Sequence, residues 1–173
     1  MKHQFFLVSL MLLLLQMGSS PAQTASVSDD GATAEDVVRI LYEYVTFGPG
    51  TTPDWDAVKE LFLPQATIIL RTTREATSVF TVDEFVQDFV SFIEGSNVKE
   101  TGFSEKILKL HPVVFGDMAS IMVLYEASIP GRDVPAQQGV DMFLLSKREG
   151  GWKIVAITND IPALGFALPQ VLQ

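Results

Sequence analysis

The chain has 173 residues, with 12 basic and 21 acidic side chains and a formal net charge of −9. Such an acidic surface repels phosphate backbones, so we expect no nucleic-acid partner. The chain has no cysteine, which excludes disulfides, thiol catalysis and a lipid-modified cysteine.

Residues 1–22 have the pattern of a secretory signal peptide. Basic Lys2 precedes an almost wholly apolar run over residues 5–15. Ser20 and Ala22 then fit the two small positions of a cleavage site. The apolar run is well short of the roughly 20 residues that span a bilayer, which argues against an uncleaved membrane anchor. We expect cleavage after Ala22 and export, to the periplasm or the extracellular space, with no membrane contact afterwards.

The remaining chain divides into a leader, one domain and a tail. Residues 23–32 are small and polar, and we expect a flexible leader there. About 150 residues remain after cleavage, which is enough for one domain with a substantial core, expected over 33–160. Residues 161–173 are apolar and interrupted by proline. Three placements stay open for this tail: over the mouth of a pocket, against a partner subunit, or frayed.

Three helices are predicted before residue 96. The first begins at Thr33, and Asp54 caps a second, shorter helix that ends before Pro64. The third begins with the capping box of residues 81–84 and closes at Gly95. In the first helix the apolar stripe at helical spacing consists of Val37, Ile40, Leu41, Tyr44 and Val45.

The remaining pattern is that of β-strands. The β-branched segment "ATIILRTT" predicts a strand between the second and third helices. Beyond residue 95 the apolar period becomes strand-like and is broken by short turns, which indicate antiparallel neighbours. Helices followed by a meander of long strands are typical of the α+β class. The predicted strands are 102–115, 118–129, 138–148 and 151–159.

Two strand segments, "SIMVLY" and "MFLL", are apolar on both alternating faces. A sheet open to water on one face would alternate apolar and polar residues instead. The helices can cover one face of the sheet only. We therefore expect a second copy of the chain to cover the outer face, which makes the protein a homodimer.

The order of these features resembles the nuclear transport factor 2-like superfamily, and most closely its exported bacterial members. That group includes SnoaL-like polyketide cyclases, ketosteroid isomerase and scytalone dehydratase. The resemblance rests on "DWDAVKELFLPQATI", "FGDMASIMVLYE" and "GGWKIVAI", which together touch most of residues 33–160. It implies a cystatin-like cone: three N-terminal helices packed on a curved, mainly antiparallel meander sheet, around an apolar pocket open at one end. It also implies dimers through the outer sheet face.

The resemblance to ketosteroid isomerase implies a pair of hydrogen-bond donors for an oxyanion. Tyr44 corresponds to the tyrosine of the first helix, and Asp141 to the acid on the strand before last. The position of the family's general base falls at or next to Leu70, and a leucine accepts no proton. If Asp141 faces the pocket, burial raises its pKa and favours the protonated donor; at the rim it is an ordinary carboxylate.

His111 is the last histidine of the mature chain and a candidate base. By strand alternation it shares a face with Lys109 and Glu105, which is expected to be the solvent side, although a bulge at Pro112 would reverse this. Glu105 lies about 20 Å away along an extended strand, too far to orient the imidazole. Glu105 is itself an alternative base, although a cross-strand ion pair is the simpler interpretation.

The leading prediction is an exported protein that binds a small apolar or aromatic molecule in the cone pocket. One alternative is a cofactor-free isomerase, cyclase or dehydratase with Asp141 and Tyr44 as oxyanion donors and Glu105 or His111 as base. Another is a structural dimerisation module whose pocket is filled by side chains. One histidine and no cysteine argue against a metal, and no cofactor is expected. The predicted ligand-binding residues are Tyr44, Trp55, Phe89, Met122, Asp141 and Phe143.

Overall fold

The structure is a computed structural model that describes residues 31–71, 75–132, 135–161 and 165–173. The predicted signal peptide (1–22) and most of the predicted leader (23–32) lie outside these ranges, so export stays a prediction. The compact unit spans Gly31–Gln173. Among its described residues, no helix is long and apolar enough to cross a membrane.

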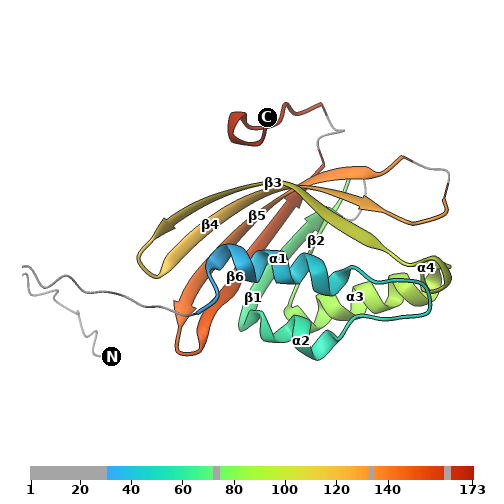
Figure 1. Ribbon diagram of the computed structural model, residues 1–173, viewed down its shortest axis with the longest axis horizontal. Helices are drawn as coiled ribbons and strands as arrows, with labels where there is room; N and C mark the ends of the chain where they lie inside the picture. The colour runs from blue at the N-terminus through green and yellow to red at the C-terminus, as the bar shows by residue number, and fades with distance from the viewer. Residues whose placement is uncertain (1–30, 72–74, 133–134, 162–164) are drawn as a thin grey trace, which may run out of the picture. The chain divides into compact units, whose positions relative to one another are not determined.

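A six-stranded sheet forms the centre of this unit, with strand order β2-β1-β6-β5-β4-β3 (Figure 1). The last four strands pair antiparallel as a meander, and β1 lies parallel to β6. The prediction of an α+β fold with a mainly antiparallel sheet is confirmed, and the four meander strands match to within two residues. The strands are β1 (Phe62–Arg71), β2 (Thr77–Phe80), β3 (Ser104–Phe115), β4 (Met118–Ser128), β5 (Gln137–Arg148) and β6 (Gly151–Asp160).

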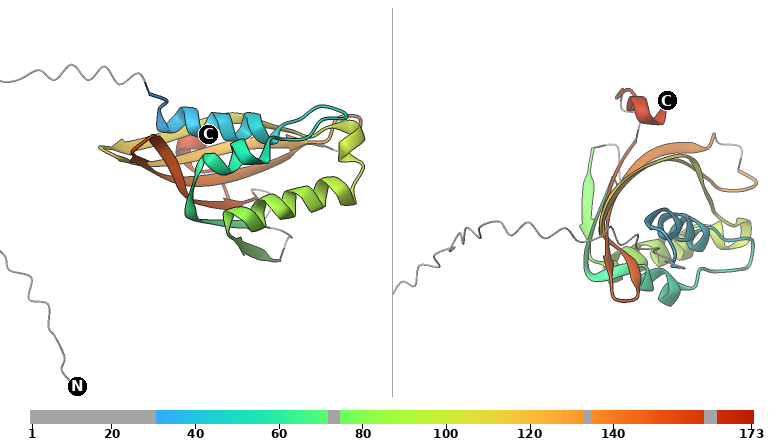
Figure 2. Two further views of the ribbon diagram at one scale, coloured as in Figure 1. Left: turned by 90° about the horizontal axis from the view of Figure 1, so that it is seen from below. Right: turned by 60° about the vertical axis from the view of Figure 1, so that its left-hand side comes forward.

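The sheet curves around the helices, which lie on its concave side (Figure 2). Helices α1, α2 and α3 lie where three helices were expected, with the β1–β2 hairpin between the second and the third, and a short fourth helix follows, so the described chain has four helices rather than three. Neither β2 nor that fourth helix was predicted, since four residues are too few to show a period. The helices are α1 (Ala34–Val45), α2 (Trp55–Glu60), α3 (Val82–Gly95) and α4 (Val98–Thr101).

The long helices begin where their capping residues predict. In α1 the Asp36 amide donates to the side chain of Thr33, and the Asp36 carboxylate accepts from the Thr33 amide. Thr81 and Glu84 form the same reciprocal box at α3. Each box satisfies two of the amides that a helix start leaves without partners, and so fixes where the helix enters the fold.

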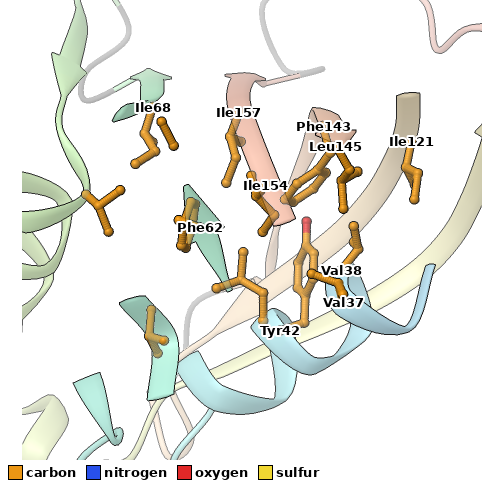
Figure 3. Close-up of a cluster of buried hydrophobic side chains, with 14 of the residues drawn as sticks. Val37, Val38, Tyr42, Phe62, Ile68, Ile121, Phe143, Leu145, Ile154 and Ile157 are labelled. Atoms are coloured by element: carbon orange, nitrogen blue, oxygen red, sulfur yellow. The ribbon is translucent and has the colours of Figure 1, made fainter. Parts of the chain in front are cut away.

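The apolar core lies between these helices and the concave face of the sheet (Figure 3). Ile68, Ile121 and Ile154 are less than 2% exposed. Full burial of each such side chain stabilises the fold by about 1.5–3 kcal/mol. The core residues labelled in Figure 3 are Val37, Val38, Tyr42, Phe62, Ile68, Ile121, Phe143, Leu145, Ile154 and Ile157.

A β-bulge in β3 decides which of its residues face the helices. Ile107 pairs with Tyr125 and Lys109 pairs with Leu124, so Leu108 is an extra residue without a partner on β4. This insertion reverses the strand alternation at Leu108. Ile107 and Lys109, which are two positions apart, therefore point to opposite faces of the sheet. The bulge also increases the local bend of the strand, which helps the sheet to curl.

The convex face of the sheet is partly covered by the end of the chain. The 3-10 helix η2 (Gln170–Leu172) lies against β3 and β4, on the side away from α1 (Figure 1). Leu172 is 2% exposed, and the ammonium of Lys109 donates to the main-chain oxygen of Gln173. The tail therefore packs on the sheet of its own chain, a placement outside the three that were considered.

Further along the convex face, apolar side chains remain open to solvent. Phe115 is 80% exposed and its cross-strand neighbour Met118 is 60% exposed. Met142 and Leu144 on β5 are also exposed. The homodimer stays a prediction, and this uncovered patch is where we expect the second copy to bind.

We expect Phe115→Glu to convert the dimer into a monomer, because a carboxylate would be buried at the centre of an apolar interface without a partner. Size-exclusion chromatography with light scattering at micromolar concentration measures this as a fall from the mass of two chains to that of one. Val79→Glu is the control, since Val79 is exposed on β2, at the opposite edge of the sheet. A monomeric wild type contradicts the dimer itself.

Candidate functional site

A cavity of about 500 Å³ lies between the concave face of the sheet and the helices α1 and α3. Its size is that of pockets which hold small organic molecules. Most of the wall is apolar, and a group of polar side chains shares it. The phenylalanines in the wall are Phe85, Phe89, Phe92, Phe103 and Phe143.

Asp141 is the centre of the polar group. The hydroxyl of Tyr42 donates to Oδ2 of Asp141 at 2.5 Å, and Nδ2 of Asn159 donates to Oδ1 at 2.7 Å. The same amide nitrogen lies 3.0 Å from the hydroxyl of Tyr125, to which it also donates. Tyr42 rises from α1 toward Phe143 on the sheet (Figure 3). Four elements, α1, β4, β5 and β6, therefore meet at this carboxylate.

The environment of Asp141 decides its charge. Burial raises the pKa of its carboxyl to about 6, against the hydrogen bonds from Tyr42 and Asn159, which lower it. The carboxyl is therefore mostly ionised at pH 7 and accepts hydrogen bonds. Burial, followed by the charge of Asp141, raises the pKa of the Tyr42 hydroxyl, which consequently keeps its proton.

Glu105 is the second carboxyl of the cavity. Burial and, to a smaller extent, the charge of Asp141 raise its pKa to about 8, so it is mostly protonated at neutral pH. Its backbone is held by Thr46, whose hydroxyl donates to the Glu105 carbonyl at 3.1 Å and accepts from its amide at 3.0 Å. In the part of the chain that the structure describes, its carboxyl makes no hydrogen bond.

Glu105 also lines a second hollow, on the outside of α1. Tyr42 takes part in both walls, so these two residues separate the cavity from the surface. The charged residues around this outer hollow are Arg39, Glu43 and Lys106.

The hydroxyl of Tyr125 is placed by a residue without a side chain. Gly139 lies opposite Tyr125 in the β4–β5 ladder, and a Cβ atom built on Gly139 would lie 2.3 Å from the tyrosine hydroxyl oxygen. The ring therefore lies over the glycine, in space that any other residue would fill. A glycine inside a strand is the usual sign of such a close approach, and this sign was overlooked in the sequence.

The structure places four of the predicted residues in the cavity wall: Glu105, Asp141, Phe89 and Phe143. Trp55 stands behind the wall, with its ring centroid 5.5 Å from that of Phe89. Whether any of these residues binds a ligand stays a prediction.

The prediction for Tyr44 is corrected, because it is 39% exposed and lies outside the cavity wall. Tyr42 takes its place. The buried face of α1 includes Val38 and Tyr42, and at 3.6 residues per turn a side chain two positions further points to the opposite side. The tyrosine implied by the resemblance is present on the first helix, but two residues earlier than expected.

Met122 and His111 are also outside the cavity. His111 on β3 and Met122 on β4 are cross-strand neighbours. Ile121 and Val123, which flank Met122 on β4, point to the core, so Met122 points to the other face. His111 therefore lies on the convex face, as predicted. Glu105 was expected on the same face, and that expectation is wrong, because the bulge at Leu108 reverses the alternation. This bulge at Leu108 lies before Pro112, which is the position where a bulge had been considered.

No group of three or more histidine, aspartate or glutamate side chains in the described ranges is arranged to hold a metal ion. Arg71, which shares the cavity wall, forms an ion pair with Asp160, with 2.7 Å between Nε and Oδ1. The polar chemistry available in the cavity is thus that of carboxyl, phenol and amide groups.

No protein-family model and no curated protein matches this sequence. Solved structures do match. A proposed aromatic ring hydroxylase of Novosphingobium aromaticivorans has a TM-score of 0.55 and 22% identity, over 73% of this chain and 85% of that one. A proposed dehydratase of the NTF2-like family from Streptomyces avermitilis has 0.55 and 13%, over 72% and 90%. A protein of unknown function with a cystatin-like fold from Nostoc punctiforme has 0.56 and 10%, over 76% and 94%.

These likenesses define the class of the fold. The chain has a cystatin-like fold, similar to that of these solved structures, one of which is described as NTF2-like, as the sequence resemblance implied. At these identities the likeness concerns the fold, and the chemistry must be argued from the cavity itself.

Protonation of Glu105 should be visible in the stability of the protein. Its pKa is raised from 4.5 to about 8, so the folded state holds this proton more tightly than the unfolded state. The resulting stabilisation is full below about pH 4.5 and is lost as the pH rises to about 8. Asp141 has the midpoint of its own titration near pH 6, so most of its change occurs below pH 6.5 and the range above it reports mainly on Glu105.

We expect the free energy of unfolding of the wild type to fall by on the order of 1 kcal/mol between about pH 6.5 and 8.5, relative to Glu105→Gln. Urea denaturation followed by circular dichroism at several pH values measures it. Glu94→Gln, which removes an exposed carboxylate of α3 away from Glu105, should follow the wild type. Parallel curves for wild type and Glu105→Gln would show that Glu105 titrates as an ordinary surface group.

Proposed function

We propose that the protein binds a small molecule with an apolar or aromatic body in the cavity between α1, α3 and the sheet. The observation that carries this proposal is the cavity itself, which has a volume of about 500 Å³ and a wall rich in phenylalanine. A structural module with a filled pocket, the third prediction from the sequence, would have no such space.

The polar group gives such a ligand an orientation. Apolar contact supplies binding free energy of roughly 25 cal/mol per Å² removed from water but little direction. The carboxyl of Glu105 makes no hydrogen bond within the described ranges, and the hydroxyl of Tyr125 retains a proton to donate. A ligand with one polar end would satisfy both groups while its body contacts the phenylalanines.

Proteins of similar fold agree with a small-molecule role. They include a proposed aromatic ring hydroxylase and a proposed dehydratase of the NTF2-like family. The agreement supports the proposal at the level of the fold, and the identity of the ligand rests on direct binding measurements.

We expect the neutral fluorescent probe N-phenyl-1-naphthylamine to bind the wild type, with an increase in its emission. Leu70→Trp should weaken binding at least about tenfold, because the indole occupies the cavity that Leu70 lines. Val79→Trp adds the same ring on the exposed side of β2 and should leave the affinity unchanged. Equal affinity of the two variants would place the probe elsewhere, and no binding to the wild type would remove the proposed function.

A second candidate is acid–base catalysis without a cofactor, and the position of Glu105 favours it. A general base works best when its pKa lies near the working pH, and burial raises the pKa of this carboxyl to about 8. The oxyanion donors expected from the sequence need revision. Asp141 is ionised above about pH 6 and accepts the proton of Tyr42, which leaves Tyr125 as the better donor.

For this candidate we expect the chain to accelerate hydrogen–deuterium exchange next to the carbonyl of 2-tetralone, a neutral aromatic ketone. The rate, followed by NMR in D₂O, should rise with pH along a single titration with a pKa of about 8. Glu105→Gln should lower it about 100-fold, since it removes the base. Glu94→Gln, on the exposed side of α3, should retain the wild-type rate. An unchanged rate in Glu105→Gln would exclude Glu105 as the base.

A further inference from the structure

The charges in the cavity wall are unbalanced, and this imbalance bears on which ligands fit. Three carboxyl groups line the cavity: Asp88 on α3, Glu105 on β3 and Asp141 on β5. The one cation among the described wall residues, Arg71, is held by Asp160 through two contacts, at 2.7 and 3.2 Å. Glu105 is mostly protonated at neutral pH, and the remaining carboxylates give the wall a negative charge that no described cation of the wall neutralises.

The aromatic part of the wall also favours a positively charged ligand. Phe89, Phe92 and Phe103 line the cavity with ring centroids 5.5–6.0 Å apart and interplanar angles of 77–88°. The three ring planes are nearly perpendicular to one another, so this corner of the wall is built from ring faces as well as ring edges. The face of an aromatic ring carries partial negative charge and attracts cations.

Glu105 is the group that an incoming cation would use. Asp141 has both oxygens occupied, by Tyr42 and by Asn159. The carboxyl of Glu105 has no such partner in the described structure, and it faces the same space. An ammonium group donates up to three hydrogen bonds and accepts none, so it would pair with Glu105 without displacing an existing bond.

We infer that the ligand of this cavity is an organic cation, a protonated amine on a small aromatic or apolar body, whose ammonium group pairs with Glu105. This inference rests on the proposed binding function and narrows it to one charge class. A carboxylate of the same shape would meet the charge of Asp141, and no cation among the described wall residues is available to offset it, so such a ligand is disfavoured.

Pairing of this kind changes the protonation of Glu105. In the empty cavity its carboxyl is mostly protonated at pH 7, and an ammonium beside it favours the carboxylate. Binding therefore releases a proton, and affinity for the amine rises with pH up to about 8. Asp88 and Arg71 act across the same cavity from α3 and β1. The titratable or charged groups nearer to Glu105 are Arg39, Tyr42 and Glu43 of α1, Lys106 of β3, Tyr125 of β4 and Asp141 of β5.

Three matched probes test the inference: 2-naphthylmethylamine, 2-naphthylmethanol and 2-naphthoate, which share one ring system and differ in charge. By isothermal titration calorimetry at pH 7, we expect the amine to bind at least about tenfold more tightly than the alcohol, and the carboxylate to bind most weakly. Titrations in two buffers of different ionisation enthalpy should show that close to one proton is released with the amine and none with the alcohol.

Variants separate Glu105 from the rest of the wall. Glu105→Gln should remove the preference for amine over alcohol and the proton release, while the alcohol still binds. Glu94→Gln, an exposed residue of α3 that lines neither the cavity nor the outer hollow, should change neither. Asp88→Asn provides a second test in case Glu105→Gln does not fold. This variant should lower the affinity for the amine without abolishing the proton release.

The outcomes distinguish this inference from the proposed function. Equal affinity for amine and alcohol, tighter binding of the carboxylate, or binding of N-phenyl-1-naphthylamine but of none of the three probes would overturn the cationic class and leave the binding function standing. Failure of the wild type to bind any of the four molecules would remove the binding function itself.

Discussion

The carboxylate of Asp141, held between a tyrosine of α1 and an asparagine of β6, is the interaction on which the rest of the site depends. A charge inside an apolar cone is costly unless its oxygens are hydrogen-bonded, and here both are. The two bonds join the first helix to the last strand across the core. The negative charge that they retain contributes to keeping protons on Glu105 and Tyr42. One well-bonded anion thus helps to set the protonation of the groups around it.

Core and site share residues in this protein, so stability and chemistry are coupled. Tyr42 is 4% exposed, and its ring lies 5.8 Å from that of Tyr125 and 6.3 Å from that of Phe143, between centroids. Its hydroxyl nevertheless ends in the cavity. A substitution there removes a core ring and a hydrogen bond together, and the conservative change to phenylalanine leaves a buried carboxylate with one bond fewer. Glu105, by contrast, belongs to neither apolar core cluster, which makes it the cleaner position for separating the two effects.

The fold followed from the sequence because its signals are regular and local. Apolar spacing over residues 82–93, two capping boxes and short turns between long strands each point to one element. The site was harder to predict, because a shift of one or two positions along a helix or strand changes the face to which a side chain points. These signals do not resolve such shifts. In α1, Tyr42 and Tyr44 each continue an apolar row, and tertiary packing selects the first. In β3, the bulge at Leu108 has no glycine or proline to mark it, so strand alternation gave the wrong face for Glu105.

Gly139 shows how much of the cavity's character rests on an absent side chain. The phenol of Tyr125 lies in the space that a methyl group on residue 139 would occupy. Alanine at that position would force the ring to turn away and take its hydroxyl out of the bonding network with Asn159. The missing side chain of Gly139 on β5 thereby keeps a hydroxyl group in one wall of the cavity. In related proteins, a single glycine-to-alanine substitution at this position would make that wall of the cavity less polar and would favour more apolar ligands, although every polar residue of the wall would still be encoded.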